Sequence, residues 1–90
     1  MHAAEVPLEV ARAAANLFAM LGQLEPISSP SMLSDVRVGR LMASAALRGA
    51  LENVAINLQS ITDVAFVANS REQSRALAAQ LAEDSLSASR

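Results

Sequence analysis

The feature that most constrains the fold is the stretch from Ser34 to Ile61, which contains no proline and confines most of its charge to one side. If it is one helix, it has about 27 residues and is roughly 40 Å long. At 100° per residue, one narrow sector of this helix holds Arg37, Ser44, Arg48, Glu52 and Gln59. Most of the remaining circumference carries apolar or small residues. This apolar sector is far wider than the apolar stripe of an ordinary surface helix. The stretch therefore predicts a central helix that other helices cover from several directions.

A seam of small and amide side chains runs along the apolar part of this helix. It follows a 4-3 alternation through Asp35, Gly39, Met42, Ala46, Gly49, Asn53, Ile56 and Ser60. Asn57 lies one helical turn beyond Asn53 and faces roughly the same way. The seam fits a close helix–helix contact with hydrogen bonds between helices, or a pocket in which Asn53 and Asn57 hold a polar ligand.

Composition sets the size and the class of the protein. The chain has 90 residues, enough for one small domain. Of these, 52% are hydrophobic and 18% charged, so we expect apolar surface that contacts another subunit. Seven arginines are scattered among nine acids, for a net charge of −2, so we expect no nucleic-acid partner. The absence of cysteine excludes disulfides and thiolate metal sites, and we expect no metal. No apolar run approaches the ~20 residues of a membrane span, and the expected location is cytoplasmic.

Proline and capping residues divide the chain into three helices. We predict helices at about 7–23, 34–60 and 63–84 within a single domain, residues 1–90. Pro7 suits a first helical position, and the prolines at 26 and 30 indicate an ordered loop. Ser34 and Thr62 are the predicted N-caps of the second and third helices. The predicted fold is all-α, a three-helix up-down-up bundle with a long central helix, associating into a dimer or larger helical assembly.

Two charged residues of the central helix have alternative interpretations. Asp35 fits a favourable charge in the first helical turn, or a functional carboxylate at the mouth of the seam. Arg48 fits a solvated ion pair with Glu52, or a bidentate contact to a ligand carboxylate. No catalytic triad or metal cluster stands near them in the sequence.

Two segments resemble a known family. VPLEVARAAANLF spans residues 6–18, and SDVRVGRLMASAALRGALENVAINLQSI spans residues 34–61. The most specific part is R-G-A-x-x-N-V-x-I-N-L, which begins at Arg48. Together the two segments resemble the cyclodeaminase/cyclohydrolase family, which includes the C-terminal domain of formiminotransferase-cyclodeaminase and bacterial methenyltetrahydrofolate cyclohydrolases. The resemblance covers about residues 5 to 80.

The resemblance implies an all-helical dimer whose substrate is a tetrahydrofolate derivative bearing a one-carbon unit. The implied reactions are ring closure with loss of ammonia and hydrolysis of the methenyl bridge. Asp35, Arg48, Asn53 and Asn57 fall on positions of the recurring pattern and are the candidate ligand-binding residues. We expect Arg48 or the two amides to hold the folate and Asp35 to order the loop. The resemblance assigns no catalytic residue.

The chain also departs from the family pattern. Family members are roughly double the length, and a glycine-rich segment opens their N-terminal half. This chain corresponds to the C-terminal half, with Ser29-Pro30-Ser31 where relatives often carry N-P-N and Val36-Arg37 where they carry a small pair. We therefore expect a truncated domain, inactive alone, that a missing N-terminal half or a second chain completes. The alternative is a non-catalytic helical module that self-associates.

Overall fold

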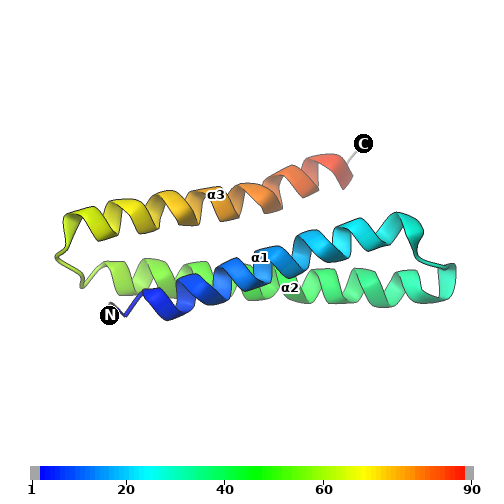
Figure 1. Ribbon diagram of the computed structural model, residues 1–90, viewed down its shortest axis with the longest axis horizontal. Coiled ribbons are helices and arrows are strands. Elements are labelled where there is room, and N and C mark those ends of the chain that lie inside the picture. The colour runs from blue at the N-terminus through cyan, green and yellow to red at the C-terminus, as the bar shows by residue number, and fades with distance from the viewer. Residues whose placement is uncertain (1–2, 89–90) are drawn as a thin grey trace.

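The computed structural model describes residues 3–88, with side chains described as far as residue 81. Helix α1 spans Glu5–Leu24, and a short 3-10 helix, η1, spans Glu25–Ile27. Helix α2 spans Pro30–Leu58, and α3 spans Val64–Ala88. In Figure 1, α1 runs from left to right, α2 returns from right to left and α3 runs from left to right again, so neighbouring helices along the chain are antiparallel. The predicted all-α three-helix bundle with a long central helix is confirmed, and the described residues contain no strand.

The caps of α2 and α3 differ from the prediction. Helix α2 begins at Pro30, so Ser34 lies inside the helix and the prediction that it is the N-cap is wrong. Ser29 occupies the cap position with an extended backbone, at φ −66° and ψ 158°. A proline is favoured directly after the cap because its missing N–H needs no partner there. At α3 the Phe66 N–H donates to Asp63 Oδ1 at 3.0 Å, so Asp63 caps the helix where Thr62 was predicted to do so.

The other helix ends differ by a few residues. Helix α1 begins at Glu5 rather than at residue 7, which places Pro7 in the third helical position. Proline is tolerated there because the first-turn N–H groups have no partner within the helix. Helix α3 continues to Ala88, four residues beyond the predicted end.

Two apolar clusters hold the three helices together. The first joins α1, α2 and α3 through Ala11, Ala14, Ala15, Phe18, Ala43, Leu47, Ala50 and Leu81. The second lies nearer the N-terminus of α1 and contains Ala4, Leu8, Val54 and Leu58, against which Phe66, Val67 and Leu77 pack. Many of these residues are alanines, so the backbones of α1 and α2 lie close together.

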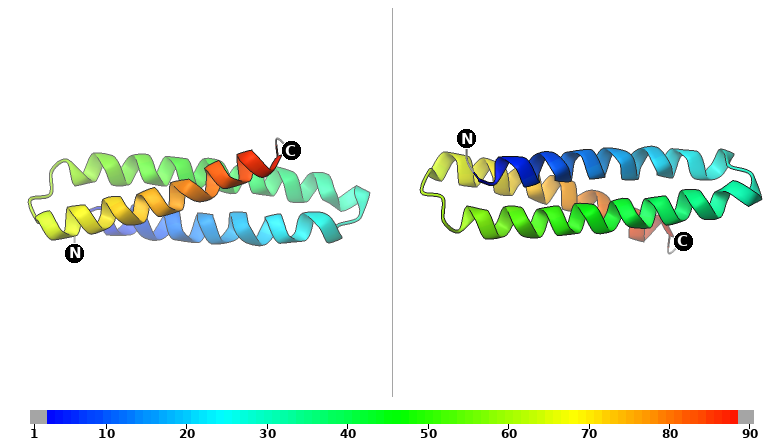
Figure 2. Two further views of the ribbon diagram at one scale, coloured as in Figure 1. Left: turned by 90° about the horizontal axis from the view of Figure 1, so that it is seen from above. Right: turned by 90° about the horizontal axis from the view of Figure 1, so that it is seen from below.

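Helix α3 covers only one side of the pair formed by α1 and α2. In the left view of Figure 2, α3 lies in front of the pair, and in the right view it lies behind. A hydrogen bond from Arg12 to Gln73 also joins α1 to α3. No helix in the described part of the chain is long and apolar enough to cross a membrane.

Candidate functional site

An open groove lies between α1 and α2 near the N-terminus of α1. Its volume is about 500 Å³. Helix α1 contributes Val6, Pro7 and Val10, and α2 contributes Ala46, Gly49, Ala50, Asn53 and Asn57. The groove thus lies at the small-residue part of the seam that the sequence indicated.

The groove exists because α2 has no bulky side chain at this level. A Cβ placed on Gly49 would meet nothing within 4 Å, so the space beside this backbone is empty. By contrast, Ala43 and Leu47 are buried against the other helices and fill the space beneath. Substituting Gly49 with alanine would therefore place a methyl group at the groove without a clash inside the chain.

Two amides are the polar groups of an otherwise apolar lining. Asn53 is exposed and Asn57 is half-buried, one helical turn apart. Each amide offers a carbonyl acceptor and an NH₂ donor. Within residues 3–81, neither side chain takes part in a hydrogen bond. Both are therefore available to a ligand that presents donors and acceptors along one edge.

The structure does not bring the other two candidate residues to this groove. Asp35 is exposed in the second turn of α2, and the 18 positions between it and Asn53 correspond to about 27 Å of helix. Arg48 is exposed and is not part of the lining. It also makes no ion pair with Glu52 in the part of the chain described here. A ligand role for Asp35 and Arg48 stays a prediction.

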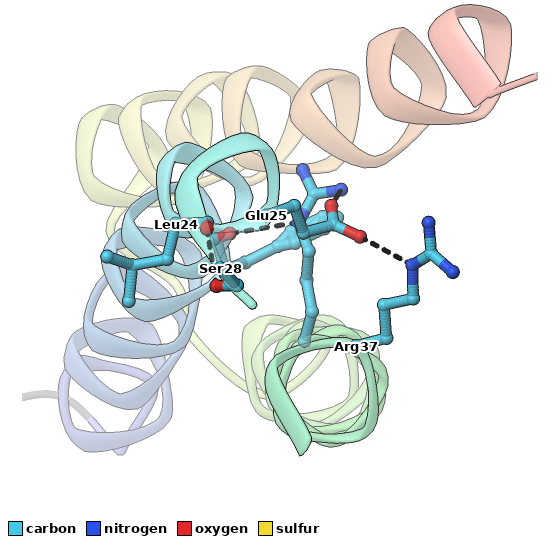
Figure 3. Close-up of polar contacts among 6 residues, drawn as sticks. Leu24, Glu25, Ser28 and Arg37 are labelled. Carbon is cyan, nitrogen blue, oxygen red and sulfur yellow. Dashed lines mark hydrogen bonds and ion pairs between the residues drawn. The ribbon is translucent and has the colours of Figure 1, made fainter. Parts of the chain in front are cut away.

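A second polar cluster lies at the opposite end of the helix pair, where α1 passes into η1. Glu25 accepts from Arg37 Nε at 3.1 Å and from Arg40 Nη1 at 3.2 Å. Arg40 also donates from Nε to the carbonyl oxygen of Phe18 at 3.2 Å, and its guanidinium lies 4.1 Å from the centre of the Phe18 ring. Figure 3 shows Glu25 and Arg37 paired, beside the hydrogen bond from Ser28 to the Leu24 carbonyl.

Sequence reasoning missed this Arg40 cluster. The available signal was Gly22, because a Cβ at this position would lie 2.7 Å from Arg40 Nη2. A glycine four residues before the first loop proline thus marks the place where a long side chain crosses the helix. The cluster joins the ends of two helices and carries no catalytic arrangement. Among the described residues no three potential metal ligands lie together.

Comparison with known proteins identifies the family. The sequence model of the formiminotransferase-cyclodeaminase family matches residues 1–76. A formimidoyltransferase-cyclodeaminase from Gallus gallus is 42% identical over 64 residues, which are 71% of this chain and 12% of the relative. The chain therefore spans only a small part of the length of that relative. No solved structure matches the chain. Since the family match covers most of the sequence, the chain belongs to the formiminotransferase-cyclodeaminase family.

Proposed function

We propose that this chain binds a tetrahydrofolate one-carbon adduct in the groove between α1 and α2. The relatives' names imply formimidoyl transfer and cyclodeamination, and the adducts we consider are the methenyl and formimidoyl forms. The observation that carries the proposal is that Asn53 and Asn57 line one groove and have no intramolecular hydrogen-bond partner among the described residues.

The groove suits a flat ligand with one polar edge. Its volume of about 500 Å³ falls within the usual range for small-molecule sites. Gly49 lacks a side chain, so an aromatic ring can approach the α2 backbone closely. Val6 and Val10 supply apolar contacts from the opposite wall. A pterin ring system has this character, because it combines flat faces with alternating donors and acceptors on its edge.

The groove alone favours binding over catalysis. Its eight lining residues include no ionisable side chain. Closing or hydrolysing a one-carbon bridge requires proton transfers, which positioned acids or bases accelerate. In our proposal this chain therefore supplies a binding wall, and cyclohydrolase or cyclodeaminase activity requires residues from a second chain or from another part of a larger domain.

A second candidate function is non-catalytic self-association. It is favoured by large apolar side chains that remain exposed beside the groove, including Val10, Leu17 and Met42. Such exposed patches mark contacts with other proteins more often than they mark free surface.

Calorimetric titration with 5-formyltetrahydrofolate tests the binding proposal. We expect saturable binding of roughly micromolar strength, equivalent to about −8 kcal/mol. Replacing both groove amides, Asn53→Ala with Asn57→Ala, should weaken binding at least about tenfold, because two polar ligand groups would lose their partners.

The matched control replaces two exposed asparagines outside the groove, Asn16→Ala with Asn69→Ala. This variant should bind like the unmodified chain. Absence of heat with the unmodified chain, or equal loss of binding in the two double variants, would refute a folate site in the groove. Circular dichroism of each variant establishes that the helices are retained.

A further inference from the structure

Gly49 is a glycine in the interior of α2 for which the described part of the chain offers no internal reason. It lies well inside the range Pro30–Leu58, where glycine is less favourable than alanine because it loses more backbone freedom on folding. None of the three glycines has a positive φ, so the backbone conformation does not require glycine. A Cβ at position 49 would meet nothing within 4 Å, so packing between the described residues does not require it either.

The other two glycines have neighbours within the chain. A Cβ at Gly22 would lie 2.7 Å from Arg40 Nη2, so the arginine occupies the space that a side chain would fill. A Cβ at Gly39 would lie 3.4 Å from Leu21 Cδ1, which is van der Waals contact. Of the three glycines, only Gly49 lines the groove. The reason for glycine at this position therefore lies outside the chain.

The groove arranges polar and apolar groups around the space at Gly49. Asn53 and Asn57 follow at four-residue intervals, which put them about 6 and 12 Å farther along one side of α2. Side chains of an α-helix lean toward its N-terminus, so the Asn53 amide leans over the turn that contains Gly49. Val10, on α1, belongs to the other wall and is 49% exposed. A ring that lies on Gly49 therefore has an amide at its edge and a valine beside it.

No charged side chain lines this space in the part of the chain that the structure describes. Arg48 precedes Gly49 in the sequence but lies on another side of α2, which it shares with Glu52 one turn beyond. Arg12 of α1 donates a hydrogen bond to Gln73 of α3 instead. A carboxylate in the groove would lose hydration without gaining a cation, which is costly. The groove therefore selects the uncharged part of a ligand.

We propose that Gly49 is the specificity-determining residue of the groove. It admits an uncharged planar ring flat against the α2 backbone, and the glutamate tail of a folate stays outside. This inference rests on the proposed folate site and adds which part of the ligand is recognised and which residue selects it. A methyl group at position 49 holds a planar ring off the backbone, and a gap of ~1 Å already removes up to about half of the attraction between facing atoms. The methyl group also moves the edge of the ring away from Asn53.

Two glycine-to-alanine variants of the same helix test the role of Gly49. Gly49→Ala and Gly39→Ala make the same chemical change, and only the first lies in the groove. In calorimetric titration with 5-formyltetrahydrofolate, we expect Gly49→Ala to weaken binding at least about tenfold, the effect of one misplaced methyl group in a binding pocket. Gly39→Ala should bind like the unmodified chain. Alanine favours helix, so both variants should keep the fold, which circular dichroism measures.

A second titration separates the ring from the tail. The probe 6-methyltetrahydropterin carries the ring system without the tail, and p-aminobenzoylglutamate carries the tail without the ring system. We expect the first probe to bind and to lose affinity in Gly49→Ala. The second should give no saturable heat, because no cation lines the groove. Saturable binding of the tail fragment, or folate binding without binding of 6-methyltetrahydropterin, would overturn the selection of an uncharged ring.

The folate site and the role of Gly49 fail in different ways. Suppose that the unmodified chain binds 5-formyltetrahydrofolate and that Asn53→Ala with Asn57→Ala weakens the binding. Equal binding by Gly49→Ala and Gly39→Ala would then overturn the role of Gly49 and leave the folate site standing. No heat with the unmodified chain would refute the folate site and the ring specificity together. Altered sedimentation of Gly49→Ala with unaltered binding would also overturn the proposal, because the glycine would then serve a contact with another chain.

Discussion

The two sides of the α1–α2 pair have similar residue types and opposite surroundings. On the side beneath α3, Leu47 and Val54 are at most 1% exposed. On the side that faces away from α3, Met42 and Ile56 of the same helix are 68% and 61% exposed. Helix α2, which is apolar nearly all round, therefore buries one side against the rest of the chain and leaves the other side exposed. The surplus of apolar surface in this short helical chain therefore lies on one side of the α1–α2 pair, the side that α3 leaves uncovered.

The largest expected effect separates the two sides directly. Leu47→Ala should lower the free energy of unfolding by about 2–5 kcal/mol, because it leaves a cavity among residues that cannot collapse fully. Ile56→Ala, on the side that faces away from α3, should change it by less than about 1 kcal/mol when the chain is dilute. Urea unfolding followed by circular dichroism measures both. Equal losses in dilute solution would contradict the difference between the two sides. A cost of Ile56→Ala that grows with protein concentration would support self-association through this side.

Removal of the Ser74 hydroxyl, on α3, should increase the stability of the fold. Its Oγ is buried and has no hydrogen-bond partner in the structure. Because an unsatisfied buried polar group is costly and alanine favours helix, Ser74→Ala should raise the free energy of unfolding by about 1–2 kcal/mol. Thermal unfolding measures the gain, with Ser34→Ala, at an exposed position inside α2, as the control. A lower melting temperature for Ser74→Ala would show that the hydroxyl has a partner after all.

The polar cluster at the α1–α2 connection predicts a difference between its two arginines. Arg40 is mostly buried, with 21% of its side chain exposed, and contacts both Glu25 and Phe18. Arg40→Met should cost about 1 kcal/mol of unfolding free energy. The side chain of Arg37 is 64% exposed, and Arg37→Met should cost only a few tenths of a kcal/mol because solvent screens its ion pair. Denaturant unfolding at low and high salt distinguishes them, and equal costs would mean that burial of the Arg40 contacts contributes nothing.

The smallest expected effect concerns two glycines. Gly49→Ala should stabilise the dilute chain by about 0.4–1 kcal/mol, because alanine favours helix and the new Cβ meets nothing within 4 Å. Gly22→Ala should gain less or nothing, since its Cβ would lie 2.7 Å from Arg40 Nη2 and Arg40 would have to move. Thermal unfolding of the two variants measures the difference. A larger gain at Gly22 than at Gly49 would contradict the crossing of Arg40 over α1.

Local patterns in the sequence predicted the helices well because their signals are short-range. The wide apolar circumference of the central helix and the prolines before it indicate three helices and their order along the chain. Ser29, not Ser34, is the N-cap of α2, because Ser29 followed by Pro30 is also a short-range cap signal and competes with the loop that the two prolines indicate. The helical repeat predicts that Asn53 lies on the seam with Asn57 one turn beyond it, and the structure places both amides in the lining of the groove. Their role as ligand-binding residues stays a prediction.

The sequence by itself therefore determined the helices, their apolar circumference and the family pattern, since all of these are properties of residues near one another along the chain. Only the tertiary structure decided which apolar side α3 covers, because residues on opposite sides of α2 are equally apolar and differ only in what packs on them. It also separated Asp35 from the groove, because Asp35 lies about 27 Å along α2 from Asn53. Arg48 is next to Gly49 in the sequence but lies on another side of α2, so it is not part of the lining. The Arg40 contacts with Glu25 and Phe18 likewise required the fold, since they join residues from two helices through a gap left by Gly22.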